Sequence, residues 1–180
     1  MKDHNRFVLN GVDLNGHLVA RWAAFFNVCN WPWVPAAVTV VQSVPSFELK
    51  FPRPLLVEIT YASSPEECWV LADRVAHSDW DHEALITMAE PTQEGGTPQI
   101  GLIGERLDLG RELAWQWGEA CLFNCLECGN MSIFADSGSF RCRVCDVGAT
   151  EGGNAHVDLL EAGWREWELA KNAVPRGPLG

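Results

Sequence analysis

The chain has 180 residues, of which 47% are hydrophobic, and a formal net charge of −11 at pH 7. The length allows one domain with its own core and a small additional module, and the hydrophobic content excludes a disordered chain. No stretch approaches the roughly 18 apolar residues of a membrane span, and no apolar run follows the first residues as in a signal peptide. We therefore expect a cytoplasmic protein, whose thiols stay reduced.

Charge and aromatic content bear on the kind of partner. Acidic residues outnumber basic ones both before and after Cys125, and Lys and Arg form no cluster in the sequence. Non-specific binding to nucleic acid depends on a basic face that releases phosphate counterions. The charge therefore favours a protein partner and leaves nucleic acid as the alternative. The nine tryptophans are typical either of a core or of a binding surface.

The predicted elements begin with a short strand over residues 6–9. An amphipathic helix over 16–30 follows, because apolar residues recur there at spacings of three and four. Pro32 and Pro35 end that helix, since proline lacks the amide hydrogen that a helix interior requires. Runs of apolar and β-branched residues then predict three strands, over residues 38–44, 46–50 and 55–61.

A second helix is predicted over residues 64–76, because Ser64, Pro65 and Glu67 form a capping box with proline in the first turn. The remaining elements are strands over 83–89 and 99–103, an extended segment over 111–123 and, after a Gly152-Gly153 linker, a helix over 155–171. A helix between two strands of one sheet implies a parallel crossover. The predicted fold is therefore α/β, with a mixed central sheet flanked by helices.

Two CxxC pairs form the strongest motif, Cys125 with Cys128 and Cys142 with Cys145. Two such pairs at this separation are typical of a four-thiolate zinc ribbon. The interval has room for a short β-hairpin, and Gly129 suits a turn at positive φ. Since thiolates fill all four positions, the expected Zn²⁺ is structural, with no coordination position for water. The alternative, two disulfides, requires a secreted protein.

Other residues with metal-binding chemistry carry weaker signals. Cys29 and Cys68 lie among apolar residues of predicted helices and are interpreted as buried packing thiols. Cys121, four residues before the first ligand, is a spare candidate ligand. A polar cluster between a predicted helix and a strand is interpreted as a loop or, alternatively, as a second metal site; its members are His77, Asp79, Asp81 and His82.

Three short segments resemble motifs of the PD-(D/E)XK nuclease superfamily: RWAAFF over 21–26, PSFEL over 45–49 and VEIT over 57–60. They are most similar to those of small proteins of actinobacterial phages and plasmids, which also carry a C-terminal zinc ribbon followed by a helix. The resemblance extends over residues 15–172 and implies a protein of the bacterial host cytoplasm. It also implies a nuclease-like α/β core over 1–120, a zinc ribbon over 121–150, a closing helix over 151–172 and a flexible tail over 173–180.

The chemistry of that superfamily requires an acidic residue on one strand, and a Glu and a Lys two residues apart on the next, so that both share a face. The carboxylates hold Mg²⁺, which stabilises the scissile phosphate and activates water, and the Lys neutralises developing charge. In this chain Ser46 stands at the acidic position, Thr60 at the Lys position and Val19 at the position of a helix Glu. Glu58 alone is retained, and a single carboxylate is a poor Mg²⁺ site.

These replacements favour a zinc-binding, non-catalytic protein of nuclease fold, acting as a binding module of a phage or other mobile element. One alternative is a Mg²⁺-dependent nuclease with a rearranged site. Glu48 and Lys50 share the Ser46 face of their strand and, with Glu58, form the candidate catalytic set. A second alternative is a phage structural or assembly component that keeps the fold as a scaffold.

Overall fold

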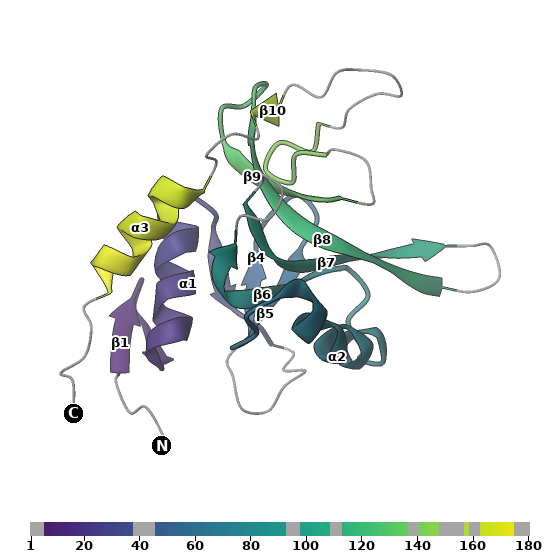
Figure 1. Ribbon diagram of the computed structural model, residues 1–180, viewed down its shortest axis with the longest axis horizontal. Helices are drawn as coiled ribbons and strands as arrows, with labels where there is room; N and C mark the ends of the chain where they lie inside the picture. Colours follow the sequence, from purple (N-terminus) through teal and green to yellow (C-terminus); the bar gives the residue numbers. More distant parts are fainter. Residues whose placement is uncertain are drawn as a thin grey trace.

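The computed structural model describes residues 6–37, 46–92, 98–108, 113–136, 141–147, 157–158 and 163–174. The predicted strand over 38–44, the Gly152-Gly153 linker and most of the predicted tail lie outside these residues. Within them, the protein is a mixed α/β structure with one large curled sheet and three helices (Figure 1). None of the described helices is long and apolar enough to cross a membrane.

The large sheet contains eight of the described strands. In the order in which they pair, they are β10 (Val157–Asp158), β8 (Leu113–Cys125), β7 (Gln99–Asp108), β6 (Glu83–Thr92), β5 (Leu55–Ile59), β4 (Phe47–Leu49) and β3 (Trp33–Pro35), with β9 (Met131–Ala135) also pairing with β8. Two further strands, β1 (Arg6–Leu9) and β2 (Val12–Asn15), form a separate hairpin. The helices are α1 (His17–Val28), α2 (Pro65–Ala76) and α3 (Trp164–Ala173).

The helix α2 connects β5 to β6, and these two strands are parallel. The other described strand pairs are antiparallel. The predicted parallel crossover in a mixed sheet is therefore confirmed.

The sheet separates two cores, because its side chains alternate between its faces. Along β5, Leu55, Val57 and Ile59 join the cluster around α1, whereas Leu56 joins a second cluster with Ala72 of α2. Helices α1 and α3 pack together on the first face, and α2 covers the other (Figure 1).

The aromatic centre of the larger core joins the first and last described helices. The ring of Trp22 on α1 lies 4.8 Å from that of Trp167 on α3, and the ring of Phe25 lies 5.8 Å from Trp167. The indole N–H of Trp22 donates to the backbone oxygen of Met88 on β6 at 2.9 Å, so α1 is also fastened to the sheet. The nine tryptophans divide by exposure: Trp22, Trp31, Trp33 and Trp167 are buried, Trp80, Trp115, Trp117 and Trp164 are partly buried, and Trp69 is exposed.

Several predicted boundaries are wrong, each for a local reason. The predicted helix over 155–171 begins only at Trp164, because Val157–Asp158 pairs with β8 and Gly163 has a left-handed φ of +90°. Strands β2 and β3 were missed: β2 follows a tight turn in which Asn10 and Gly11 both have positive φ, and β3 ends at a proline on the edge of the sheet.

The capping box at the start of α2 is also wrong in detail. Ser64 is the N-cap but makes no side-chain capping bond. The carboxylate of Glu67 instead accepts the backbone N–H of Ser63 at 2.7 Å, one residue earlier than a capping box requires. The helix itself ends at Ala76, as predicted.

Candidate metal centre

The two CxxC pairs form two turns with the same backbone geometry. In the first, the N–H of Gly129 donates to the oxygen of Cys125 at 2.8 Å, and the N–H of Cys125 donates to the oxygen of Asn130 at 2.9 Å. The second turn has the same two bonds around Cys142. The N–H of Asp146 donates to the oxygen of Cys142 at 2.8 Å, and the N–H of Cys142 donates to the oxygen of Val147 at 2.9 Å.

Each turn requires a left-handed residue just after its second cysteine. Gly129 has φ +69°, which confirms the expectation for that position. Asp146 has φ +58° in the second turn, and Asp is one of the few residues besides Gly that adopts this conformation without a large cost. The sequence therefore encodes both turns, although only the first contains the expected glycine.

The four sulfurs converge on one point. The Sγ atoms of Cys125, Cys128, Cys142 and Cys145 all lie within 4.8 Å of one another. Cys125 and Cys145 are 3.9 Å apart, and Cys128 and Cys142 are 3.7 Å apart. Four sulfurs held tetrahedrally at about 2.3 Å from one zinc would be about 3.8 Å apart. A disulfide brings its sulfurs to about 2.05 Å, and the cysteines are free, so the arrangement fits a metal and not two disulfides.

The thiols differ in acidity. Burial raises the pKa of Cys125, and burial together with hydrogen bonds that the Cys145 thiol donates to the sulfurs of Cys142 and Cys128 raises the pKa of Cys145 to about 12. Burial acts in the same direction at Cys128, but hydrogen bonds from the backbone and side chain of Asn130 and from the thiols of Cys145 and Cys142 lower its pKa to about 7. A thiolate at Cys128 is therefore stabilised by its neighbours, and metal binding requires deprotonated ligands.

The strand β8 connects the site to the sheet. It runs without interruption from Leu113 to Cys125, pairing with β7 over its first part and with β9 over 120–124. The described part of the interval between the two CxxC pairs contains β9, which pairs with β8; residues 137–140 of that interval lie outside the described part of the chain. The first ligand is thus the last residue of a core strand.

A buried arginine ties the second turn to the sheet. Arg143, between the ligands Cys142 and Cys145, is only 3% exposed. Its Nε donates to Glu83 at 2.6 Å and its Nη2 to Glu105 at 2.7 Å. Its backbone N–H donates to the hydroxyl of Ser132 on β9 at 2.8 Å. One residue therefore links the turn to β6, β7 and β9.

A second arginine extends this network. Arg141 also donates to Glu83, and its Nε lies 3.4 Å from the carboxylate of Asp146. Arg53, just before β5, lies 3.8 Å from the same carboxylate. Arg53, Arg141 and Arg143 thus join Glu83, Glu105 and Asp146 in one ion-pair network, which includes Arg143 and Asp146 of the second turn.

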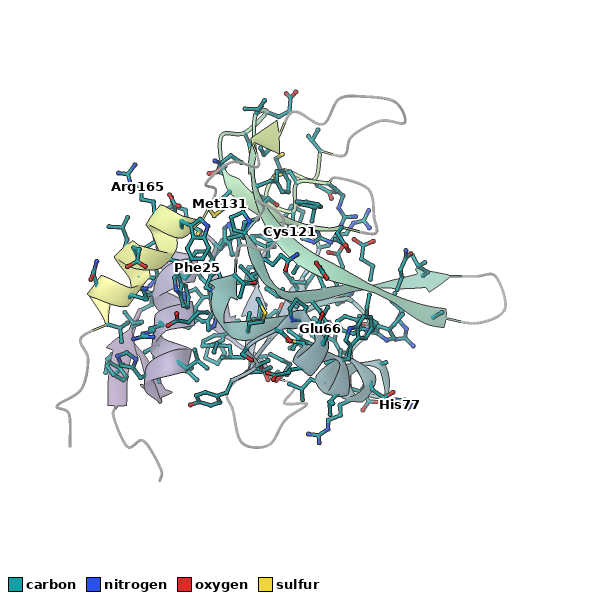
Figure 2. All side chains as sticks on the ribbon, in the orientation of Figure 1. Phe25, Glu66, His77, Cys121, Met131 and Arg165 are labelled. Atoms are coloured by element: carbon teal, nitrogen blue, oxygen red, sulfur yellow. The ribbon has the colours of Figure 1, made fainter. Side chains whose placement is uncertain are left out.

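The remaining cysteines lie outside this site. Cys121 is buried on β8, and it does not belong to the group of four converging sulfurs within the described residues. Burial raises its pKa to about 12, which disfavours the thiolate. Cys29 and Cys68 are buried in the two cores, as expected for packing thiols, and burial raises the pKa of both, to about 11 for Cys68. Figure 2 shows Cys121 on β8, inside the fold.

The candidate catalytic set is divided between two interactions. Glu58 is 1% exposed on β5, and the hydroxyl of Ser46 donates to it at 2.5 Å. Glu48 and Lys50 instead pair with each other at 2.5 Å, near the surface. Thr60 is buried, and its hydroxyl donates to the backbone oxygen of Thr87 at 2.8 Å. The structure thus places the Ser46 hydroxyl beside the Glu58 carboxylate.

The structure also shows where Val19 and the polar cluster after α2 lie. Val19 is buried on α1, within the larger core. In the polar cluster after α2, His82 lies 3.3 Å from Asp81, whereas His77 lies 3.6 Å from Asp73 of α2, outside the cluster. Within the described residues, these side chains are not among the groups that could hold a metal, and His77 points outward at the end of α2 (Figure 2).

The arginine network was missed by sequence reasoning. Arg143 lies 60 positions from Glu83 along the chain, so no local pattern connects them. One signal was available: Glu83 is a charged residue at the start of an apolar strand, and a buried carboxylate needs a partner.

Comparison with known proteins gave no relative. No model of a protein family, no curated protein and no solved structure matches this chain. The resemblance to PD-(D/E)XK nucleases therefore stays a prediction, as do the domain boundaries drawn from it.

Proposed function

We propose that this protein is a zinc-stabilised, non-catalytic binding module with a fold related to the PD-(D/E)XK nucleases. The observation that carries the zinc assignment is the convergence of four cysteine sulfurs, at the separations that a tetrahedral zinc site requires. All four positions are thiolates, so the metal has a structural role and activates no water. Iron also binds four thiolates, and metal analysis distinguishes the two.

The non-catalytic part of the proposal rests on what the motif positions do. Thr60 bonds to a backbone carbonyl, and Val19 lies in the core, so neither supplies the charge that phosphodiester cleavage needs. A hydroxyl next to Glu58 does not replace a second carboxylate for Mg²⁺. The excess of acidic residues supports a protein partner over non-specific nucleic acid. A phage or mobile-element origin rests on the sequence resemblance alone.

Two other functions follow from the same residues. A Mg²⁺-dependent nuclease would need Glu48 or Lys50 to leave their mutual ion pair and turn toward Glu58. A structural or assembly component would use the same scaffold in a permanent complex. Co-purification in a stable stoichiometric complex, without affinity for nucleic acid, would favour the structural role.

Metal content is the first test. We expect the purified protein to contain about one zinc per chain by atomic emission, and Cys128→Ser to lose most of it. Cys121→Ala is the matched control, because it removes a buried thiol of β8 that lies outside the converging group, and it should keep its zinc. Unchanged zinc in Cys128→Ser, or a comparable loss in Cys121→Ala, contradicts the assignment.

A cleavage assay tests the absence of catalysis. Duplex, single-stranded and branched DNA and RNA are incubated with the zinc-loaded protein in Mg²⁺ or Mn²⁺, with Glu58→Ala in parallel. We expect no cleavage from either. Cleavage by the wild type that disappears in Glu58→Ala would overturn the proposal and establish the rearranged nuclease site.

A further inference from the structure

A groove runs between α2 and the β7–β8 pair, on the face of the sheet opposite α1. Its volume is about 420 Å³, within the usual range of ligand pockets. It is lined by Trp69, Ala72, Asp73, Ala76, His77, Trp115 and Trp117. The metal ligands and the motif positions are not among these residues.

On the helix side, the residues that line the groove form one continuous stripe. The four lining residues of α2 and its C-cap residue, His77, follow the spacing i, i+3, i+4, i+7 and i+8, which places them on one face of a helix. The two alanines leave space between the helix and the sheet, and Trp69, which is 49% exposed, borders it. This stripe shares Ala72 with the buried one, which also holds Cys68 and Val75.

The sheet side is a pair of stacked indoles. Trp115 and Trp117 alternate along β8 and so share a face, with ring centroids 5.2 Å apart and planes 16° apart. Gly104 on β7 lies opposite Trp117, and a Cβ at Gly104 would come within 2.6 Å of the indole ring. The glycine therefore allows the Trp117 ring to lie against the sheet.

The charge in the groove is negative. Asp73 supplies a carboxylate that is 79% exposed, and the imidazole of His77 lies 3.6 Å from it. No Lys or Arg belongs to the lining. Arg106 lies opposite Trp115 in the strand register, on the same face of the sheet, and lines the neighbouring cavity beside Pro54. Indole faces attract cations through their quadrupole, and a carboxylate beside them adds to that attraction.

We propose that this groove binds an arginine-bearing, basic segment of a protein partner. The guanidinium is planar and weakly hydrated and stacks on aromatic rings, so it matches three indoles and one carboxylate better than a neutral side chain does. The net charge of −11 steers a basic segment toward the protein and repels nucleic acid. This inference rests on the proposed function, because it specifies the chemistry of the partner that the binding module binds.

Synthetic peptides provide the test. A short peptide with two arginines among glycines and serines is titrated into the zinc-loaded protein by calorimetry, beside the same peptide with citrulline in place of arginine. Citrulline keeps the shape and removes the charge. We expect binding of the arginine peptide and at least tenfold weaker binding of the citrulline peptide. Trp69→Ala and Asp73→Asn should each weaken arginine-peptide binding by about three- to tenfold.

Val70→Ala is the matched control. Val70 follows Trp69 on α2, is 65% exposed and lies outside the groove, so this variant should bind the arginine peptide with unchanged affinity. Indole N–H resonances of the wild type give a second measurement that needs no variant in the groove, and the peptide should shift those of Trp69, Trp115 and Trp117.

Equal binding of both peptides, full affinity in Trp69→Ala, or no shift of these resonances would overturn the inference. Binding of single-stranded oligothymidine that is lost in Trp69→Ala would also overturn it and assign the groove to nucleic acid. Zinc content and cleavage are measured on the same preparations. An intact zinc site, absent cleavage and absent peptide binding would refute the groove assignment alone.

Discussion

Arg143 joins the second turn of the candidate metal site to three strands of the sheet. It is buried between two carboxylates on different strands and also bonds to the backbone oxygen of Ile133. Burying a charge is costly unless it is paired and hydrogen-bonded, and here Glu83 and Glu105 provide that pairing. Removing the arginine leaves these carboxylates with less compensation, so the loss should exceed that of a surface ion pair.

We predict that Arg143→Met lowers the free energy of unfolding by about 3 kcal/mol, measured by urea denaturation of the zinc-loaded protein. Met retains much of the side-chain volume, so the effect reports on charge and hydrogen bonds. The double variant Arg143→Met with Glu83→Gln should lose less unfolding free energy than the two single variants added together. The reason is that Glu83→Gln removes the carboxylate that Arg143→Met leaves without this partner. A loss below about 1 kcal/mol would show that the network contributes little.

At the scale of elements, the regular parts of the chain were predictable and the junctions were not. The helix α1 was predicted because one apolar period runs through it, and α2 because Pro65 marks its start. The start of α3 was missed because the spacing of Val157, Trp164 and Trp167 fits a single helix. In the structure, Val157 belongs to a strand, and the turn at Gly163 separates it from the helix. Only the pairing of Val157 with Cys125, which is non-local, decides between strand and helix.

Gly163 marks that junction and can be tested. Its φ is +90°, and a Cβ there would come within 2.2 Å of Cδ1 of Leu122, a fully buried side chain on β8. We predict that Gly163→Ala destabilises the protein by about 2–4 kcal/mol, from left-handed strain and overpacking together, measured by chemical denaturation.

Gly11→Ala is the control for strain without a clash. Gly11 has φ +76°, but a Cβ there would have no atom within 4 Å. We therefore expect it to cost about 1 kcal/mol, from backbone strain alone. Equal losses in the two variants would show that Leu122 moves aside freely.

At the scale of the whole molecule, the candidate metal site and the sheet form one structure. The strand β8 belongs to both, β9 pairs with it, and the indole N–H of Trp31 donates to the backbone oxygen of Met131 on β9 at 2.8 Å. The grouping of the four cysteines was predictable because their spacing alone indicates a thiolate site. Their attachment to the core was not, since it depends on contacts between residues far apart in the sequence.

Metal removal should therefore affect the entire fold. We predict that a strong chelator lowers the melting temperature by at least about 10 °C, since loss of several kcal/mol shifts a protein of this size by a few degrees per kcal/mol. Circular dichroism and tryptophan fluorescence should change in a single transition. Two separate transitions, with the fluorescence of the buried tryptophans retained in the first, would instead support an independent ribbon over 121–150.

The packing of Trp167 against Trp22 and Phe25 has a consequence for synthesis. The aromatic side chains of α1 are made early, yet part of the surface that covers them belongs to α3. At about 5–20 residues per second, roughly 7–30 seconds pass between the synthesis of Trp22 and that of Trp167. During that time the nascent chain exposes an aromatic helix, so chaperone binding should concentrate on α1 and end when α3 docks.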